Sequence, residues 1–424
     1  MVVGKQLRVE TFSQAPDQGS RALDVGKQKR KGLHGQKPRR PAKARKGAGG
    51  VGRMARIAGM PGPAAGSAAP VGRARTLAQV YRHFGEDDAA GTSPLYERVA
   101  VALSESGEAL RAIEAAPARK RHPTVILAAL HDLALAGRAP ALAAAYTAAD
   151  ADAAAAAAID TVLRMTDSIV AIAVRRQTRP NETGRCAVLY PAIAEAARRV
   201  GGNAVGLIDV GCSAGFNLNV DRVGIAYSDG QSLGDPSCPV QMSSSIVGER
   251  PIPARAIPEV VARVGVDLDP VDVTDADDAR WLRACLWPDQ PERAARLEAE
   301  MALAATAPPL LLQGDAVEVM PDAFARVPAD ALPVVTTTWA VSRFPLESRP
   351  RFLHRLDEAA VGRAVAWVSV EGVGVAPAIP TLGDRRASGH SIIGLAVFDQ
   401  SALRAEAIGR CWSQGRFLAW LTDS

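Results

Sequence analysis

The amino-acid sequence predicts an α/β protein in which a helical N-terminal region precedes a mostly parallel β-sheet with an antiparallel edge strand. Apolar residues recur at helical spacing between about residues 93 and 176. From residue 181 onward, short runs rich in Val, Ile and Leu alternate with helical stretches. Such runs, separated by helices, are typical of buried parallel strands. A stretch rich in Lys, Arg, Gly and Pro precedes both regions and is expected to be disordered.

Composition divides the chain of 424 residues into three predicted parts: a disordered basic tail at 1–75, a helical domain at 76–180 and an α/β domain at 181–424. The tail holds 17 Lys and Arg against 3 Asp and Glu, although the net charge of the whole chain is only +5. Three interpretations of the tail stay open. It is a solvated segment without a specific role, a mis-assigned start, since Met54 or Met60 could begin a chain of uniform composition, or an arm that binds nucleic acid. Nucleic acid is the least favoured partner, because no aromatic residues that could stack bases interleave with the basic ones.

Three longer helices are expected in the helical domain. Ser93 is a suitable N-cap and is followed by proline at the first helical position. A second helix is expected over about 124–136 and a third over 153–176. The third begins with a run of alanines, which favours a helix and indicates no functional site.

The α/β domain is predicted from alternating strands and helices. A helix over 187–200 leads to a strand over 204–210, and a hairpin insert is expected at 220–240 because that segment carries turn signals. Further strands are expected at 309–315, 333–339, 364–370, 391–398 and 416–421, with helices at 278–306 and 345–360. The last two strands are expected to pair antiparallel at the edge of the sheet.

The most informative segment is a strand end followed by a glycine-rich turn. Asp209 ends the strand, and Gly211, Ser213 and Gly215 lie in a turn that is expected to lead directly into a helix. The two glycines permit a sharp turn and the close approach of a ligand. The N–H groups at a helix start would favour an anionic ligand group. Ligands of open α/β sheets bind at this carboxyl edge.

Two nucleotide-binding motifs are excluded at this turn. A dinucleotide motif would need glycine at 213 and Gly or Ala at 216, but the chain has Ser213 and Phe216. The Gly-Lys-Ser/Thr triplet of a P-loop does not occur. The remaining pattern, Asp-x-Gly-x-x-x-Gly, resembles the first motif of S-adenosylmethionine-dependent methyltransferases of the Rossmann-like class. The resemblance implies a Rossmann-like, methyltransferase-type sheet with S-adenosylmethionine as cofactor; a tight turn without a ligand is the alternative.

The same resemblance makes three more residues candidates for cofactor binding. Asp267 would accept hydrogen bonds from the ribose hydroxyls, and the alternative is a solvated acidic loop. Asp315 would accept from the adenine amino group, or cap the following helix, and one residue can do both. Arg185 would reach the carboxylate of the cofactor's methionine part, and the alternative is that Asn181 and the residues after it only cap a helix.

A longer resemblance extends over about residues 80–424. It rests on seven strings in a fixed order: RPNETGR, DVGCSAGFNLNVDR, LGDPSCPV, GVDLDPVDVTD, LWPDQPERAARL, GDA and VVTTTWAVSRF. These are similar to strings of an uncharacterised, mainly actinobacterial family, domain of unknown function 2332. The resemblance implies a methyltransferase-like Rossmann fold behind a helical region, and no reaction. Where members tend to have a His-Ser pair after the fourth strand, this chain has Thr337 and Thr338, which speaks against a catalytic role of that site.

Metal, disulfide and membrane functions are not expected. The histidines show no HxxxH or HxH spacing, and the five cysteines show no CxxC pair. The cysteines are expected to be reduced thiols of a cytoplasmic protein, and Cys212 to be a small residue in a tight turn rather than a nucleophile. No apolar run reaches the roughly 18 residues of a membrane helix, and the first residues lack the apolar core of a secretory signal.

These observations predict an S-adenosylmethionine-binding protein that methylates a small molecule. The general base and other catalytic residues are not identified. One alternative is a non-catalytic Rossmann-like module for binding or regulation, which the absence of an obvious base and the Thr337–Thr338 segment favour. The other is a nucleic-acid-associated protein that uses the basic tail. The methyl acceptor and the oligomeric state stay open.

Overall fold

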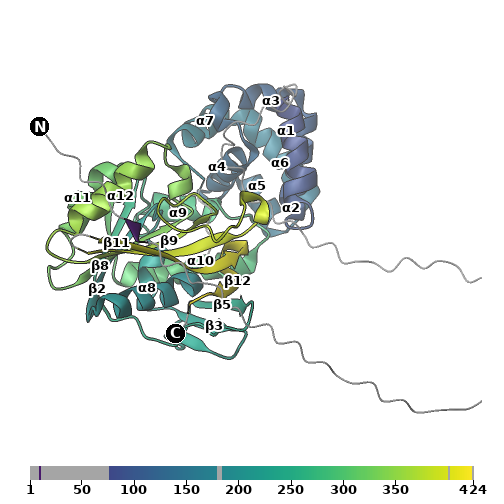
Figure 1. The fold of residues 1–424 in the computed structure, drawn as a ribbon. Coiled ribbons are helices and arrows are strands. Elements are labelled where there is room, and N and C mark those ends of the chain that lie inside the picture. The colour runs from purple at the N-terminus through teal and green to yellow at the C-terminus, as the bar shows by residue number, and fades with distance from the viewer. Residues whose placement is uncertain (1–8, 11–75, 179–183, 400–401, 423–424) are drawn as a thin grey trace, which may run out of the picture. The chain divides into compact units, whose positions relative to one another are not determined.

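The computed structural model describes residues 9–10, 76–178, 184–399 and 402–422 (Figure 1). Most of the predicted basic tail lies outside these residues, as does the expected cap at Asn181. Strand β1 (Val9–Glu10) is the part of the tail that is described, and it pairs in parallel with β11. From residue 76 onward, the described residues belong to one compact unit, in which a helical region is followed by an α/β region.

The helical region follows the predicted pattern with one correction. Its helices are α1 (Leu77–His83), α2 (Pro94–Glu105), α3 (Gly107–Ile113), α4 (Pro123–Leu135), α5 (Pro140–Thr147), α6 (Ala151–Arg164) and α7 (Thr166–Arg175). The predicted N-cap is confirmed, because Ser93 Oγ accepts a hydrogen bond from the N–H of Tyr96 at 3.1 Å. The predicted single helix over 153–176 is wrong, since it breaks at Met165. The hydroxyls of Thr161 and Thr166 bond to backbone carbonyls near this break, a contact that competes with regular helix geometry.

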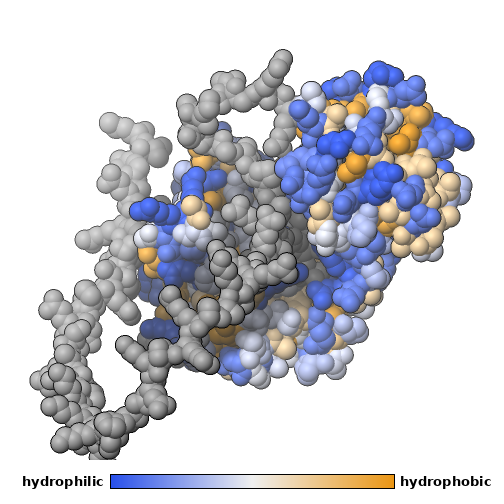
Figure 2. All heavy atoms as spheres, turned by 90° about the vertical axis from the view of Figure 1, so that its right-hand side faces the viewer, coloured by the Kyte–Doolittle hydropathy of each residue, from blue (hydrophilic) through white to orange (hydrophobic). Residues whose placement is uncertain are grey.

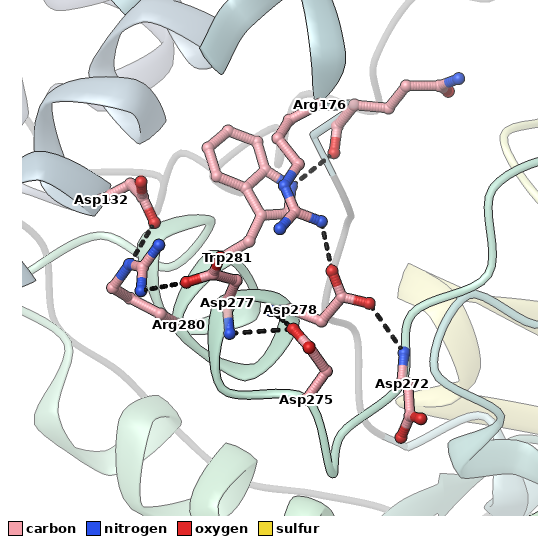
Figure 3. Close-up of polar contacts among 9 residues, drawn as sticks. Asp132, Arg176, Asp272, Asp275, Asp277, Asp278, Arg280 and Trp281 are labelled. Carbon is pink, nitrogen blue, oxygen red and sulfur yellow. Dashed lines mark hydrogen bonds and ion pairs between the residues drawn. The ribbon is translucent and has the colours of Figure 1, made fainter. Parts of the chain in front are cut away.

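The helical region is bound to the α/β region through α9 (Ala276–Ala284). Trp281 of α9 is 1% exposed and lies in the core of the helical region. Its Nε1 donates to the carbonyl of Gln177 at 2.9 Å, and Arg280 pairs with Asp132 of α4 at 2.9 Å (Figure 3). Asp278 pairs with Arg176 in the same network. Seen from the right-hand side of Figure 1, the surface of the helical region mixes hydrophilic and hydrophobic residues (Figure 2).

The described residues form a 12-stranded sheet that is mixed in direction, with five parallel strands at one end. The parallel strands are β2 (Ala204–Val210), β6 (Glu259–Asp267), β7 (Leu310–Gln313), β8 (Leu332–Thr338) and β9 (Val365–Gly372). Their spatial order is β7-β6-β2-β8-β9, which is third, second, first, fourth and fifth along the chain. Doubly wound folds begin with this order, and its direction reverses between β2 and β8. The carboxyl ends beside this reversal are where such sheets bind ligands.

The second half of the sheet differs from the prediction. It contains β10 (Ser391–Asp399), β11 (Ala402–Trp412), β12 (Phe417–Trp420), β5 (Gln241–Ile246), β3 (Gly224–Tyr227) and β4 (Ser232–Gly234). Strand β10 is antiparallel to both β9 and β11, and β11 separates it from β12, so the expected pairing of the last two predicted strands with each other at the edge is wrong. The insert forms a hairpin of β3 and β4, and β5 pairs in parallel with β12. The insert therefore extends the sheet beyond the last strand of the chain.

Two other expected elements have different forms. The predicted helix over 278–306 is divided into α9 and α10 (Pro291–Thr306), because proline favours the start of a new helix. The glycine-rich turn leads only into a single 3₁₀ turn, η3 (Phe216–Asn219), and then into β3. The expected α-helix directly after the turn is therefore wrong. The sequence NLNVDRVG explains this, because Asn, Asp, Val and Gly have low helix propensity.

Helices cover both faces of the sheet (Figure 1). Helix α8 (Cys186–Val200) ends at Gly201, close to the predicted range, and packs on one face over apolar residues of β2, β8, β9 and β10. Helices α11 (Ala316–Phe324) and α12 (Ser348–Ala359) pack on the other face. With both faces buried, the strand ends are the part of the sheet where a pocket can form.

Candidate functional site

A pocket of about 210 Å³ lies at the carboxyl ends of the parallel strands. Five of the seven residues predicted to bind a cofactor line it: Arg185, Gly211, Ser213, Asp267 and Asp315. The other two, Asp209 and Gly215, are not among its lining residues. Helix α8, strand β5 and helix α10 contribute further lining residues, Cys186, Met242 and Glu300. The sequence therefore predicted one side of the pocket, formed by the strand ends.

Asp209 lies beneath the pocket. Its side chain is 1% exposed, and its carboxylate accepts hydrogen bonds from Thr336 Oγ1 at 2.7 Å and from Asn217 Nδ2 at 3.2 Å. Burial raises the pKa of Asp209 to about 6, while these two hydrogen bonds and the charge of Arg185 act in the opposite direction. Asp209 therefore holds β8 and the η3 turn in position under the pocket. It does not line the pocket, as a residue in direct contact with the cofactor would.

The backbone conformation and the close packing of the protein both require glycine at positions 211 and 215. Gly211 and Gly215 have φ angles of +76° and +73°, in the region that favours glycine. A Cβ atom at 211 would lie 2.9 Å from the Cβ of Ala340, and one at 215 would lie 2.9 Å from Cγ of Pro309. Both contacts are with protein atoms, so close packing already explains both glycines without a ligand.

The carboxylate of Asp267 stabilises the turn that contains Ser213. Its carboxylate accepts hydrogen bonds from the backbone N–H of Ser213 at 2.9 Å and of Asp269 at 3.0 Å. Ser213 has a φ angle of +53°, and its Oγ is buried without a hydrogen-bond partner among the described residues. The carboxylate at the end of β6 thus fixes a turn that carries a buried hydroxyl.

Asp315 has the capping role that was considered for it. Its Oδ1 accepts a hydrogen bond from the N–H of Val317 at 2.9 Å, at the start of α11. Asp315 also lines the pocket, so capping and contact with a ligand are compatible.

Arg185, the residue directly before α8, also lines the pocket. Its guanidinium lies 5.1 Å from the ring centroid of Trp339, and it donates to Thr338 Oγ1 at 3.0 Å. Asn217 also donates to Thr338 Oγ1, at 3.4 Å. The Thr-Trp segment after β8 therefore positions an arginine, and Trp339 itself has a φ angle of +55°.

Sequence reasoning missed two buried carboxyl groups. Glu371, at the end of β9, is 1% exposed and accepts hydrogen bonds from the N–H groups of Ala340 and Val341, both at 2.9 Å, and of Ser342 at 3.3 Å. Burial raises the pKa of Glu371 to about 7. These contacts hold the turn that forms the pocket wall after β8. A glutamate directly after the strand predicted over 364–370 was the available signal.

Glu300, on α10, is the second missed group. It lines the pocket although its side chain is only 4% exposed, and burial raises its pKa to about 8. In the sequence it lies in a helix with many charged residues, so nothing distinguished it from Glu292 or Glu298.

A family model described as "Uncharacterized protein conserved in bacteria (DUF2332)" matches residues 78–420. The chain belongs to this family. Its description covers bacteria in general, so the narrower, mainly actinobacterial range expected from the sequence has no support. No curated protein and no solved structure matches the chain. For this DUF2332 member, the pocket itself is therefore the basis for a functional proposal.

Clustered metal ligands and a single membrane-spanning helix are both absent from the described residues of this DUF2332 protein. In the ranges given above, no group of three or more His, Cys, Asp or Glu side chains is placed to hold a metal ion. Among the same residues, no single helix is long and apolar enough to cross a membrane; α4 and α5 reach that length only as a pair bent by 98°.

Proposed function

We propose that this protein binds S-adenosylmethionine in the pocket at the carboxyl edge of the sheet and transfers its methyl group to a small molecule. The observation that carries the proposal is a pair of carboxylates on neighbouring strands. Asp267 ends β6 opposite Gln313, the last residue of β7, and Asp315 follows two residues later. Both aspartates line the same pocket, beside the reversal of strand order.

The hydrogen-bonding capacity of the two aspartates suits a nucleoside. Asp267 accepts the N–H of Ser213 with Oδ2 and that of Asp269 with Oδ1, and a carboxylate can accept more than two hydrogen bonds, so it suits the two donors of vicinal ribose hydroxyls. The cap of α11 uses Oδ1 of Asp315, and Oδ2 takes no part in it. An adenine amino group would therefore find an acceptor there.

The pocket has polar capacity that the described residues do not satisfy. Ser213 Oγ and Glu300 Oε2 are both buried without a hydrogen-bond partner among those residues, and both belong to lining residues. Buried polar atoms normally have partners, so a polar ligand fits this pocket. At about 210 Å³ the pocket is small for a cofactor of this size, part of which would extend beyond it.

Methyl transfer would depend mainly on how the protein positions the acceptor relative to the methyl group. When bound, the cofactor supplies an electrophilic methyl group on its sulfonium. The protein's own residues would hold the acceptor in line with that group and exclude water, which can account for much of a rate enhancement. Arg185, held by Thr338 and Trp339, is placed to bind a carboxylate of the ligand.

Calorimetry with S-adenosylmethionine and its demethylated product tests the proposal. We expect the wild-type protein to bind at least one of them, and Asp267→Asn and Asp315→Asn each to weaken binding about tenfold or more. Asparagine at 315 keeps the helix cap, so a loss there reports on the ligand. Asp322→Asn, at an exposed position of α11, is the matched control and should bind as the wild type does. No heat with either compound on folded wild-type protein would contradict the proposal.

A second candidate is a binding or regulatory module without turnover. It is favoured by the η3 turn, which replaces the helix whose N-terminus would face an anionic group, and by the position of Asp209 beneath the pocket. It predicts that S-adenosylmethionine binds while no member of a small-molecule acceptor library becomes methylated. Methylation of any member would exclude this candidate.

A further inference from the structure

The proposed function assigns no contact to Glu300, a buried residue of the pocket lining. Glu300 lines the pocket with Cys186, Phe216 and Met242, and its side chain is only 4% exposed. Its Oε2 is buried and has no hydrogen-bond partner in the described part of the chain. Buried carboxylates in proteins are paired with a cation or satisfied by several hydrogen bonds. A ligand group is therefore the natural partner of Glu300.

The charged groups near Glu300 do not neutralise it. Arg296 lies one turn earlier on α10 and lowers the pKa of Glu300, but burial has the larger effect and raises it to about 8. Burial raises the pKa of the Cys186 thiol on α8; the charges of Glu300, Asp209 and Asp221 add to this rise, and that of Arg185 opposes it. The other charged residues of the pocket lining are Asp267, Asp315 and Arg343. At about pH 7 the neutral acid form of Glu300 is therefore favoured.

Two other residues of the pocket lining indicate the kind of ligand group. Phe216 packs against a cluster that contains Leu297 and Met301 of α10. Its ring and the thioether of Met242 are polarisable surfaces, which attract organic cations as well as apolar groups. The ring of Trp339 is already engaged by Arg185. A pocket that combines a buried carboxyl group with such surfaces suits a cation whose charge is surrounded by carbon atoms.

We propose that Glu300 is the counter-charge of a subsite for an organic onium cation. The identity of that cation rests on the proposed function, under which it is the sulfonium of S-adenosylmethionine. The subsite itself rests on the burial of Glu300, its place in the pocket lining and the absence, among the described residues, of a hydrogen-bond partner for its buried Oε2.

The proposal has a consequence for proton balance. A cation next to Glu300 favours the carboxylate, so cation binding at about pH 7 releases a proton from Glu300 to the solvent. The demethylated product has a neutral thioether in place of the sulfonium and releases none. After methyl transfer Glu300 would take up a proton from solvent, and the attraction to the ligand would be lost. The subsite would thus distinguish substrate from product.

Calorimetry at about pH 7 in phosphate and in Tris measures this proton, because the two buffers differ in ionisation enthalpy. For the wild type we expect about one proton released per S-adenosylmethionine bound, and none for the demethylated product. Glu300→Gln, a neutral isostere of the acid, should bind S-adenosylmethionine more weakly and release no proton. Glu298→Gln is the control on the same helix; Glu298 is 51% exposed and paired with Arg283, and the variant should behave as the wild type does.

Equal proton release by the wild type and Glu300→Gln, or wild-type binding of S-adenosylmethionine without release, would overturn the proposal. Glu300→Met, of similar volume, replaces the first variant if that one does not fold. If neither adenosyl compound binds any variant, the proposed function fails and the subsite is tested with trimethylsulfonium alone. A larger rise in the unfolding temperature of the wild type than of Glu300→Gln supports the subsite, and an equal rise refutes it.

Discussion

Three buried carboxyl groups at or beneath the pocket differ in what they contact. Asp209 accepts two side-chain hydrogen bonds, Glu371 accepts three from backbone N–H groups, and Glu300 has no hydrogen-bond partner among the described residues for its buried Oε2. Burial raises all three pKa values, to about 6, 7 and 8 respectively. Glu300 has the highest value, because burial outweighs the charge of Arg296, which favours the ionised form.

Glu371→Gln tests the support of the pocket wall. Glutamine has one acceptor oxygen where the glutamate has two, and its amide would face backbone N–H groups that need acceptors. We expect the free energy of unfolding to fall by about 1–3 kcal/mol, measured by urea denaturation. Glu347→Gln, at an exposed position in the adjoining loop, should leave it unchanged within about 0.5 kcal/mol. An unchanged free energy of unfolding in Glu371→Gln would mean that the hydrogen bonds of Glu371 do not stabilise the turn after β8.

The site residues that the sequence predicted are those whose position follows from the strand pattern. Asp267 and Asp315 directly follow or end apolar runs, and such positions meet at one edge of a parallel sheet. Glu300 could not be found in this way, because its contact with the pocket depends on how α10 packs against elements far away in the sequence. Asp209 also lies near the end of an apolar run, as Asp267 does. Its carboxylate, however, accepts a hydrogen bond from Thr336 on the neighbouring strand and does not line the pocket.

Among the elements, α9 decides how the helical region is attached to the sheet. Arg280 and Arg283 lie on the same helix and differ in burial: the Arg280–Asp132 pair has side-chain exposures of 25% and 8%, and the Arg283–Glu298 pair has 39% and 51%. The Arg280–Asp132 pair joins α9 to α4 of the helical region (Figure 3), whereas the Arg283–Glu298 pair joins α9 to α10.

Arg280→Gln should therefore be much more disruptive than Arg283→Gln. Removal of Arg280 leaves the carboxylate of Asp132 buried without its cation, a loss on the order of 3 kcal/mol. The exposed pair at Arg283 should contribute less than about 1 kcal/mol. Thermal unfolding of the two variants compares them directly, and hydrogen exchange should show the extra opening of Arg280→Gln in α4 and α9. Equal destabilisation by the two variants would contradict this account of α9.

Element prediction succeeded where burial is uniform and failed where it is mixed. The strand over 204–210 is apolar except for Asp209, is buried from Val205 onward, and was predicted with its full length. Strand β11 was missed, because ALRAEAIGRCW alternates buried and less buried residues, is rich in Ala, and has little intrinsic β preference. Its pairing with β10 and β12 makes it a strand. These hydrogen-bond partners cannot be seen in the sequence of the segment itself.

For the whole molecule, the raised pKa values predict how stability depends on pH. Asp209, Glu300 and Glu371 are protonated more in the folded than in the unfolded chain, so their contribution is complete below their ordinary pKa values and is lost as pH rises through about 6 to 8. The unfolding temperature should therefore be higher at about pH 5 than at about pH 8.5. Glu300→Gln should flatten this profile in its alkaline part. A profile that rises over this range would mean that other groups dominate.

The pairing of β5 with β12 connects the insert to the last strand of the chain. Ser245 and Ile246 lie beside Phe417 and Leu418. During synthesis on a ribosome, β5 emerges about 170 residues before β12, and its edge stays open until residues 417–420 have been made. Contacts this distant in sequence slow folding, and open strand edges invite association with other chains. The edge of β5 is therefore exposed to such association while the chain between the two strands is being made.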